Sequence, residues 1–316
     1  MQSNLGYACI NMTLREQGIT TNRRCTKRTF ESKGLDHISN LVLANVTDLK
    51  KIIQWNIDND VMLFRISSNL FPWFSKYDLH DLKDSKQILN TLIECGRLAT
   101  EAGQRLSFHP GQFCVLASPD EAVVANAIVD LDNHGKIFDF MGLSQTPYNK
   151  INIHVGGAYG DKASALERFC KNFKRLAPST QTRLTVENDD KANMFSVREL
   201  YEGVHKVIGI PIVFDYHHHK FCTGDLSERE ALELAMSTWP DTVKPCTHYS
   251  EGRDIEYAMK GIDEKVTPRA HSDYIYNEID DYGYSIDIMV ESKAKELAII
   301  DYSSKFPLDS QKELVY

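Results

Sequence analysis

Short hydrophobic runs recur along the chain, and a longer stretch with helical spacing follows each of them. Several of these runs are apolar at successive positions, which is typical of parallel strands that are covered on both faces. The pattern predicts strands at residues 5–12, 61–68, 105–112, 151–157, 183–189, 211–219, 242–250 and 285–291.

The stretches between these strands carry apolar residues at the spacing of helices. They predict helices at residues 45–60, 84–103, 120–142, 161–178, 196–209, 226–239 and 291–300. Eight alternations of strand and helix predict an α/β fold, a single (β/α)8 TIM barrel. No linker rich in Pro, Gly or Ser interrupts the pattern, so we expect residues 1–316 to form one domain.

Composition narrows the class of protein. The chain has 316 residues, a net charge of −8 and 42% hydrophobic residues, which is ordinary globular composition. No apolar run is long enough to span a membrane, and the start of the chain lacks the pattern of a signal peptide. The seven cysteines are dispersed without a CxxC pair, as in reduced compartments. We therefore expect an intracellular protein of the cytoplasm or nucleus.

Side chains that bind metals follow most of the predicted strands. The active site of a TIM barrel lies at the carboxyl ends of its strands, so these side chains are expected to converge. Imidazole nitrogen and carboxylate oxygen suit Mn, Zn or Fe, and eight ligands exceed one tetrahedral site. The pattern predicts two or three metal ions held by His109, His154, Glu187, Asp215, His218, His248, His271 and Glu291.

Simpler interpretations exist for each of these residues. A single histidine or glutamate at a strand end is often a structural or solvated side chain. The three successive histidines at 217–219 are also compatible with a chance surface cluster. We expect Asp215 and His218 to bind metal, and His217 and His219 to lie either beside the metal ligands or at the surface. The joint placement at six of eight strand ends favours the metal site, because buried unpaired carboxylates are costly.

Several segments together resemble the UV damage endonucleases, over roughly residues 3–300. The matching segments are "LGYACINMTL", "RISSNLFPW", "SFHPGQFCVLASP", "INIHVGGAYGDK", "LTVENDD", "VFDYHHH", "RAHSDYI" and "DIMVESKAKELA". The resemblance implies a barrel similar to xylose isomerase with a cluster of divalent metals, typically manganese. It also implies an enzyme that nicks DNA immediately 5′ of pyrimidine dimers, 6-4 photoproducts and some other lesions. The products would carry a 3′-hydroxyl and a 5′-phosphate.

The resemblance also assigns roles to residues. The eight predicted metal ligands stand where the family has its own, with Glu187 as the bridging carboxylate. The implied catalytic centre is formed by Glu187, His109, Asp215 and Glu291. The implied contacts with the lesion or the neighbouring phosphate are Tyr7, Asn11 and the probe pair Gln112 and Phe113. The implied cofactors are two or three Mn²⁺ ions, with Mg²⁺, Zn²⁺ or Co²⁺ as alternatives.

Two positions depart from the family pattern. Lys76 stands where the family tends to carry a histidine after the "SSNLFPW" segment. Cys246 replaces a lysine that is sometimes carboxylated in the family, two residues before His248. Lys244 would substitute for that lysine only if the strand bulges. The departures leave the number of ions and the lysine modification open.

A basic segment follows the first predicted strand and belongs on the active face. Its cations are Arg23, Arg24, Lys27, Arg28 and Lys33. A solvated charge run is the alternative interpretation, but a local basic face would let a chain of charge −8 bind DNA. We expect the partner to be damaged double-stranded DNA, with no membrane, no obligatory protein partner and a monomeric chain.

Three other functions remain compatible with the pattern. An apurinic-site endonuclease would differ mainly in its lesion preference. A metal-dependent sugar isomerase or epimerase would gather the same ligand types but would need neither a basic loop nor an exposed Gln–Phe pair. A DNA-binding protein without turnover would need coordination spheres with no open position for water.

Overall fold

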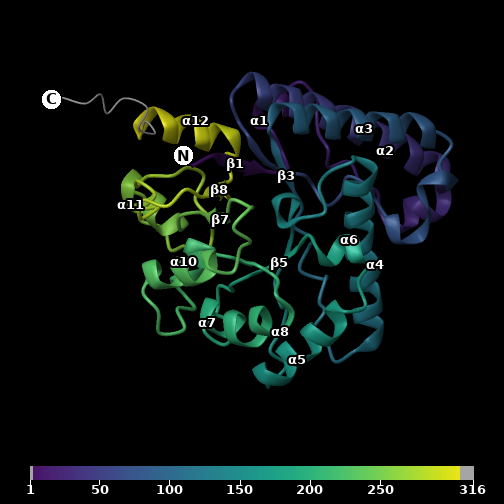
Figure 1. Cartoon of the computed structure of the whole chain (residues 1–316). Helices are drawn as coiled ribbons and strands as arrows, with labels where there is room; N and C mark the ends of the chain where they lie inside the picture. The colour runs from purple at the N-terminus through teal and green to yellow at the C-terminus, as the bar shows by residue number, and fades with distance from the viewer. Residues whose placement is uncertain (1–2, 307–316) are drawn as a thin grey trace.

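Eight strands alternate with helices in the computed structural model, which describes residues 3–306 (Figure 1). Each strand lies within one of the predicted runs, and each is shorter than its run. The strands are β1 Leu5–Ala8, β2 Leu63–Arg65, β3 Arg105–Ser107, β4 Ile151–Ile153, β5 Leu184–Glu187, β6 Ile212–Val213, β7 Cys246–Tyr249 and β8 Asp287–Val290.

The strands form two parallel sheets, which confirms the α/β class. One sheet has the order β3-β2-β1-β8-β7, and the other has the order β4-β5-β6. Single bridges link the edges of the two sheets, between Phe108 and Ile151 on one side and between Asp215 and His248 on the other. Gly6 faces Leu63 across β1 and β2, where a Cβ atom would lie 2.3 Å from the Leu63 carbonyl oxygen.

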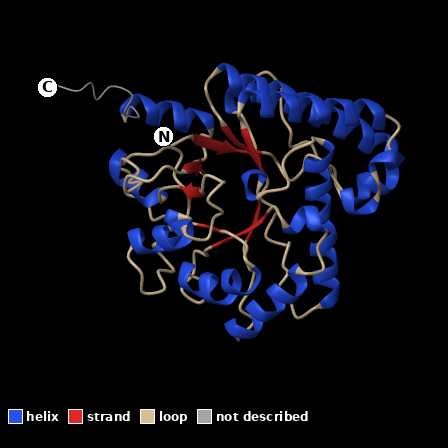
Figure 2. Ribbon diagram, viewed as in Figure 1, coloured by secondary structure: helices blue, strands red, loops and turns tan. Residues whose placement is uncertain are grey.

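Helices surround the strands (Figure 2). The longer ones match the predicted amphipathic stretches, and three-residue 3₁₀ turns and a π-helical turn at Tyr201–His205 complete the connections. The α-helices are α1 Met12–Arg15, α2 Lys27–Asp58, α3 Ser85–Ala102, α4 Glu121–Phe140, α5 Lys162–Phe173, α6 Pro178–Gln181, α7 Val197–Leu200, α8 Lys206–Ile208, α9 Tyr216–His219, α10 Glu228–Met236, α11 Arg253–Lys260 and α12 Glu296–Lys305.

Several elements differ from the prediction, since α1 and α11 lie where no helix was predicted and α2 and α9 replace other expected structure. Helix α2 begins at Lys27, inside the basic segment predicted as a loop, because the Thr26 side chain caps it at the Thr29 amide. Gly34, with φ of 61°, kinks this helix. The end of the sixth predicted strand is the short helix α9, because the Asp215 carboxylate accepts a hydrogen bond from the His218 amide.

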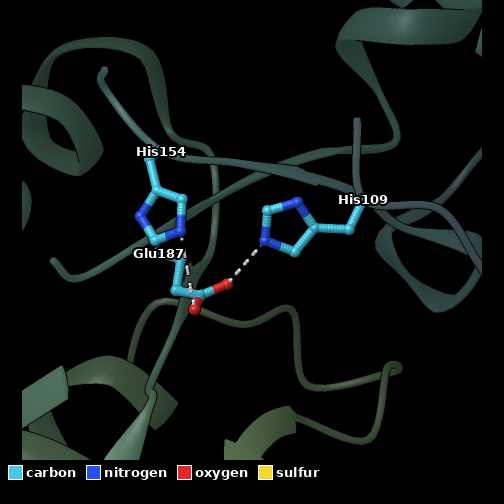
Figure 3. Close-up of side chains that lie close together, drawn as sticks. All are labelled: His109, His154 and Glu187. Carbon is cyan, nitrogen blue, oxygen red and sulfur yellow. Dashed lines mark hydrogen bonds and ion pairs between the residues drawn. The ribbon is translucent and has the colours of Figure 1, made fainter. Parts of the chain in front are cut away.

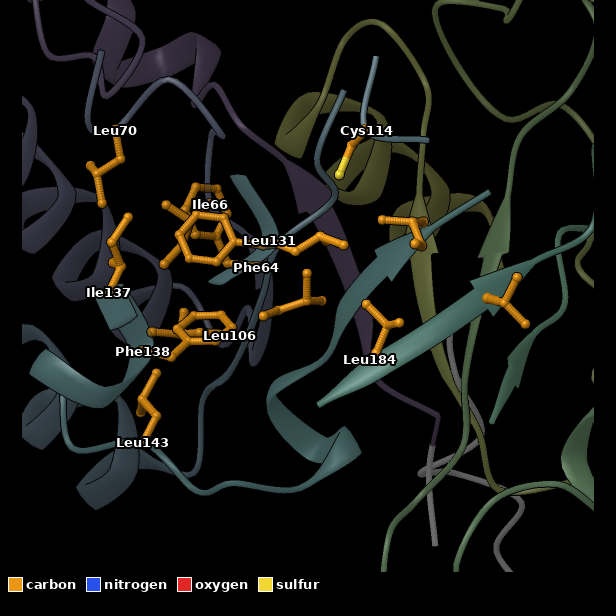
Figure 4. Packing of buried hydrophobic residues seen from close by; sticks show 14 of the residues in the cluster. Phe64, Ile66, Leu70, Leu106, Cys114, Leu131, Ile137, Phe138, Leu143 and Leu184 are labelled. Atoms are coloured by element: carbon orange, nitrogen blue, oxygen red, sulfur yellow. The ribbon is translucent and has the colours of Figure 1, made fainter. Parts of the chain in front are cut away.

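The hydrophobic core lies between the sheets and the surrounding helices. Figure 4 shows Phe64 and Leu106 from β2 and β3 packed with Leu131 and Phe138 from α4. These side chains are fully buried, and burial of each is worth about 1.5–3 kcal/mol. None of the helices within residues 3–306 has the length and apolar character needed to cross a membrane.

Two fully buried arginines close the end of the strands opposite the predicted site. Arg105 donates to Asp287 at 3.0 Å and to the carbonyl oxygens of Tyr148 and Lys244 at 2.7 and 2.8 Å. Arg183 donates to Asp139 at 2.7 Å and to nearby carbonyl oxygens. Each charge therefore has a carboxylate partner and several further acceptors, as buried charges require.

Candidate metal centre

All eight predicted ligands lie at the carboxyl ends of the strands or in the loops that follow them. Glu187 is the last residue of β5, and His248 lies within β7. His154 and Glu291 come directly after β4 and β8, and His109 comes two residues after β3. Asp215 and His218 come from the start of α9, and His271 lies between α11 and β8. The structure thus brings residues from six strand ends to one region.

Glu187 is the centre of this group, and its side chain is buried. Its Oε2 lies 3.2 Å from His109 Nε2 and 3.0 Å from His248 Nδ1. Its Oε1 lies 3.3 Å from His218 Nδ1 and 3.8 Å from His154 Nε2. Figure 3 shows His109 and His154 directed at the carboxylate from two neighbouring strands. The Glu187 carboxylate therefore lies within ion-pair distance of four imidazole rings.

Two further carboxylates, those of Glu291 and Asp215, complete the group near His248. Glu291 Oε1 is 3.3 Å from His248 Nδ1, and Glu291 also forms an ion pair with Arg65. His271 lies at the margin, since its Nδ1 is 3.2 Å from the Glu291 carbonyl oxygen and 4.0 Å from the carboxylate. Asp215 Oδ2 is 3.9 Å from His218 Nδ1.

The crowding shifts the pKa values of these groups in opposite directions. Burial raises the pKa of Asp215 to about 7, although the nearby His218 opposes the shift. Burial would also raise the pKa of Glu187, but His248 and His154 hold it well below its usual value. Burial lowers the pKa of His248 to about 4. Burial opposes protonation of His154 too, but Glu187 and Asp189 raise its pKa to about 9.

The residues fit a divalent metal ion on their own geometry. Two triads have donor atoms within 4.8 Å of one another: His109, His154 and Glu187, and Glu187, Asp215 and His248. Within the described chain, Asp215 Oδ2 is buried without a hydrogen-bond partner. Such an orphaned atom is costly, and a cation held by the triad would satisfy it. The donor set of imidazoles and carboxylates suits Mn, Zn or Fe.

Several residues that support the ligands were missed by the sequence reasoning. Asp189 Oδ1 lies 3.1 Å from His154 Nδ1, so it orients that imidazole. The Asn188 side chain accepts from the Asp215 amide at 2.8 Å, and Asn152 donates to Glu187. Asn188 and Asp189 come directly after the predicted ligand Glu187, so their position in "VENDD" was an available signal.

Lys244 does not lie in the cluster. Its Nζ pairs with Asp287 Oδ1 at 2.9 Å, at the opposite end of the strands. Lys244 therefore does not reach His248, which the sequence allowed only for a bulged strand. A different lysine reaches that ring: Lys150 Nζ lies 2.9 Å from His248 Nε2. Lys150 lies directly before β4, at the amino end of that strand. The sequence analysis looked for ligands at the carboxyl ends of the strands, so it could not have identified Lys150.

The loop after β3 carries the predicted probe pair beside the cluster. Gln112 lines a cleft together with His109, His154, His218 and Glu291. Phe113 next to it is 84% exposed. Tyr159, in the loop after β4, is 50% exposed, and the guanidinium of Arg168 lies 5.6 Å from its ring centre. Arg168 also donates to the Ala117 carbonyl at 2.8 Å, so it ties the two loops together.

Tyr7 and Asn11 are buried, contrary to the expectation that they contact DNA. The Tyr7 hydroxyl donates to Asn56 Oδ1 at 2.7 Å and accepts from Asn11 Nδ2 at 2.8 Å. Asn11 also caps α1 by accepting from the Leu14 amide. Both polar groups are used inside the protein, and burial raises the pKa of Tyr7.

The basic segment divides into one structural and several exposed cations. Arg23 pairs with Asp48 at 2.6 Å and donates to the Gly18 carbonyl, so it holds the segment against α2. Arg24, Lys27, Arg28 and Lys33 are exposed around the start of that helix. Arg23 is therefore already engaged within the protein, whereas the other four side chains are open to solvent.

Comparison with known proteins identifies the family. The family profile described as UV-endonuclease UvdE matches residues 3–314. The UV-damage endonuclease of Schizosaccharomyces pombe is 36% identical over 322 residues, which cover 98% of this chain and 51% of that protein. The chain spans about half the length of the curated fungal relatives that it matches.

Solved structures agree with this assignment. The crystal structure of SacUVDE superposes with a TM-score of 0.81 and 30% identity, and covers 96% of this chain and 98% of that chain. A 3-keto-D-glucoside 4-epimerase from E. coli gives a TM-score of 0.55 at 10% identity, covering 96% of this chain and 98% of the epimerase, and so shares the fold alone. With a profile that spans nearly the whole sequence and a superposition of nearly the whole structure, the chain belongs to the UV-endonuclease UvdE family.

Proposed function

We propose that this chain is a DNA repair endonuclease that nicks damaged duplex DNA immediately 5′ of UV photoproducts. The proposed reaction is metal-assisted hydrolysis of a phosphodiester, which leaves a 3′-hydroxyl and a 5′-phosphate. The observation that carries the proposal is the buried cluster around Glu187 beside a loop with an exposed aromatic side chain. The relatives' names point to the same substrate class.

The proposed site holds two or three divalent ions, with Mn²⁺ as the first choice. Two triads that share Glu187 support at least two ions, with Glu187 as the bridging carboxylate. The proposed ligands are His109, His154, Glu187, Asp215, His218, His248, His271 and Glu291. When bound, such ions activate water as a nucleophile and neutralise charge on the phosphate. We also propose that the chain forms one closed (β/α)8 barrel domain. The single bridges between Phe108 and Ile151 and between Asp215 and His248 support this proposal at both pairs of sheet edges.

The protein's own groups hold this centre in place. Asp189 fixes the ring of His154, and Asn188 fixes the backbone of Asp215. Arg65 holds Glu291 beside His248 and lowers the pKa of that carboxyl against the effect of burial. Such supporting contacts keep the ligands in the required geometry before the substrate arrives.

Lesion recognition depends on shape in this proposal. A photolesion weakens stacking, so insertion of a side chain costs less there than in intact duplex. Phe113 provides an exposed stacking face, and Gln112 provides hydrogen-bonding groups for exposed base edges. Tyr159 adds a second exposed ring on the neighbouring loop. Arg24, Lys27 and Arg28 are the proposed phosphate contacts, so binding should weaken as salt rises.

The test is nicking of irradiated supercoiled plasmid with Mn²⁺, compared with unirradiated and depurinated plasmid. We expect nicks on irradiated DNA that disappear with chelator and in His218→Ala. His80→Ala is the matched control, because His80 is exposed and outside the cluster. Nicks confined to depurinated plasmid would point to the apurinic-site activity. No nicking with any divalent metal would contradict the proposed function.

A further inference from the structure

A groove leads away from the candidate metal centre, between the loops that follow β5 and β6. Asp190 and Lys191 line both the cleft that contains the cluster and the next hollow along the surface. That hollow and a third one share Ala192 and Phe221. The three hollows are therefore neighbours, and we call the two that lie outside the cleft the far groove. Apart from Lys162, its lining residues lie within 190–199, 220–225 and 267–269.

The far groove adjoins the metal cluster through packed rings. Phe221 lines both of its hollows and is half-buried. The Phe221 ring meets the His217 ring edge-on, with the ring centres 5.3 Å apart. The His217 ring in turn lies 5.4 Å from the ring of His271, a predicted metal ligand. The groove is thus built against the margin of the candidate site.

Exposed cations gather in the far groove. They are Lys191, Arg198, Lys220 and Arg269. Lys191 and Lys220 form no ion pair with any residue that the structure describes. Arg198 donates to the Asp225 carbonyl at 3.1 Å, which leaves further N–H groups of its guanidinium for another acceptor. Ammonium and guanidinium groups that are open to solvent are well suited to bind phosphate.

Carboxylates do not cancel this charge. Lys162 also lines the far groove, but it is paired with Glu199 at 2.7 Å. Outside that pair, the lining has the four exposed cations and two carboxylates, those of Asp190 and Asp225, which gives a local charge of +2. Asp190 lies 3.9 Å from Arg269, and an exposed pair at this distance contributes little. The whole chain has a net charge of −8, so a positive groove beside the metal centre favours a polyanion there.

The far groove and the basic segment lie on opposite sides of the strands. The basic segment follows β1 and leads into α2, whereas the loop of residues 190–196 follows β5 and leads into α7. With the two single bridges between the sheets, β5 is four strands away from β1 in either direction. Figure 1 shows α2 and α7 on opposite sides of the strands. A duplex that crosses the metal centre would therefore meet cations on both sides of it.

We propose that the far groove binds the phosphate backbone of duplex DNA, on the side of the metal centre opposite to the basic segment. The inference rests on the proposed function and adds a second contact surface for the same substrate. Contacts with phosphates carry no information about the bases, so the groove strengthens binding to damaged and intact duplex alike. Each such contact releases counterions, and the slope of log affinity against log salt changes by about 0.9 per phosphate.

The experiment compares the full chain with its Lys191→Gln/Lys220→Gln double variant by fluorescence anisotropy. A photoproduct duplex and an intact duplex are titrated over a series of NaCl concentrations, with chelator present so that neither is cut. We expect the salt slope of the double variant to become shallower by about 1.8, from two lost contacts, with both duplexes. Its preference for the photoproduct should stay the same. Lys171→Gln/Lys174→Gln is the matched control, because these exposed lysines lie at the other end of α5 from Lys162.

Three results would overturn the inference. One is an unchanged salt slope in Lys191→Gln/Lys220→Gln. Another is an equal change in the control variant, which would show that only the net charge of the chain matters. The third is a loss of affinity for the photoproduct duplex alone, which would assign the two lysines to lesion recognition. A wild-type chain that binds neither duplex would refute the proposed function itself, and the inference with it.

Discussion

Titratable side chains are buried at both ends of the strands, but the two groups differ in the hydrogen-bond partners that they have. At the amino end, Arg105 has Asp287 and the Tyr148 and Lys244 carbonyls, so its guanidinium has a partner on several sides. At the carboxyl end, Asp215 Oδ2 lacks a hydrogen-bond partner among the described residues. The first arrangement pairs a buried charge, whereas the second has the donor atoms that could hold a metal ion. Buried charge by itself therefore does not indicate function, and a buried polar atom without a partner is the more informative observation.

The largest expected effect is at the carboxyl end, in Glu187→Gln. The substitution keeps the shape of the side chain but removes the negative charge that four imidazoles share. We expect nicking to fall by about 10³-fold or more, because metal ions contribute several kcal/mol of charge stabilisation. Nicking rate and bound Mn²⁺ per chain measure the effect. Glu199→Gln, which loses a partly exposed pair with Lys162, is the control and should nick normally.

The next effect is at the amino end, in Arg105→Met. This variant leaves Asp287 buried with only Lys244 as a cationic partner, and we expect a loss of about 3–5 kcal/mol in the free energy of unfolding. Mn²⁺ affinity of the folded protein should not change. Arg97→Met, which breaks an exposed helical pair with Glu101, should cost about 0.5 kcal/mol or less. Urea unfolding of both variants compares them, and equal losses would show that the buried Arg105 pair stabilises the fold no more than an exposed pair.

Much of this arrangement could be predicted from the sequence. The strand runs ended in His109, His154, Glu187 and Glu291, and the rule for parallel barrels was enough to place them together. The start of α2 was missed, because a basic run without apolar spacing gives no helix signal although Thr26 caps it. The burial of Tyr7 was missed as well, since its hydroxyl partner Asn56 lies 49 positions away.

Phe113→Ala should weaken recognition of damaged DNA without changing the stability of the fold. Its ring is 84% exposed, so the free energy of unfolding should hardly change. Stacking of a base on an aromatic side chain is worth about 1–3 kcal/mol, so binding to a lesion should weaken by about 5- to 150-fold. Fluorescence anisotropy with a photoproduct duplex and an intact duplex measures the preference. Ile300→Ala is the control, because Ile300 is an exposed apolar residue on α12. An unchanged preference for the lesion in Phe113→Ala would refute the proposal that Phe113 stacks on DNA at the lesion.

The smallest expected effect is a pH dependence that only the carboxyl end should show. The pKa of Asp215 is raised in the folded metal-free protein to about 7. Its protonated form therefore stabilises that state at low pH, and this contribution is lost as the pH rises toward about 7. Mn²⁺ needs the carboxylate, so affinity should fall by about tenfold per pH unit below 7 through this group.

Asp215→Asn isolates this effect, because it removes the group that titrates. His154, with a pKa raised to about 9, also releases a proton to bind metal, and its contribution should persist in the variant. Calorimetric Mn²⁺ titrations between about pH 5.5 and 8.5 measure both contributions. If the slope below pH 7 is the same in Asp215→Asn, the assignment to Asp215 is wrong.

The most direct test of the central claim uses a duplex oligonucleotide with one defined photoproduct. The chain is stripped of metal with chelator, assayed, and assayed again after Mn²⁺ is restored, beside Glu187→Gln under the same conditions. We expect no cleavage by the metal-stripped chain. With Mn²⁺ restored, we expect one nick directly 5′ of the photoproduct, and no such nick from Glu187→Gln. Cleavage that persists without metal, or that Glu187→Gln performs at the wild-type rate, would contradict it.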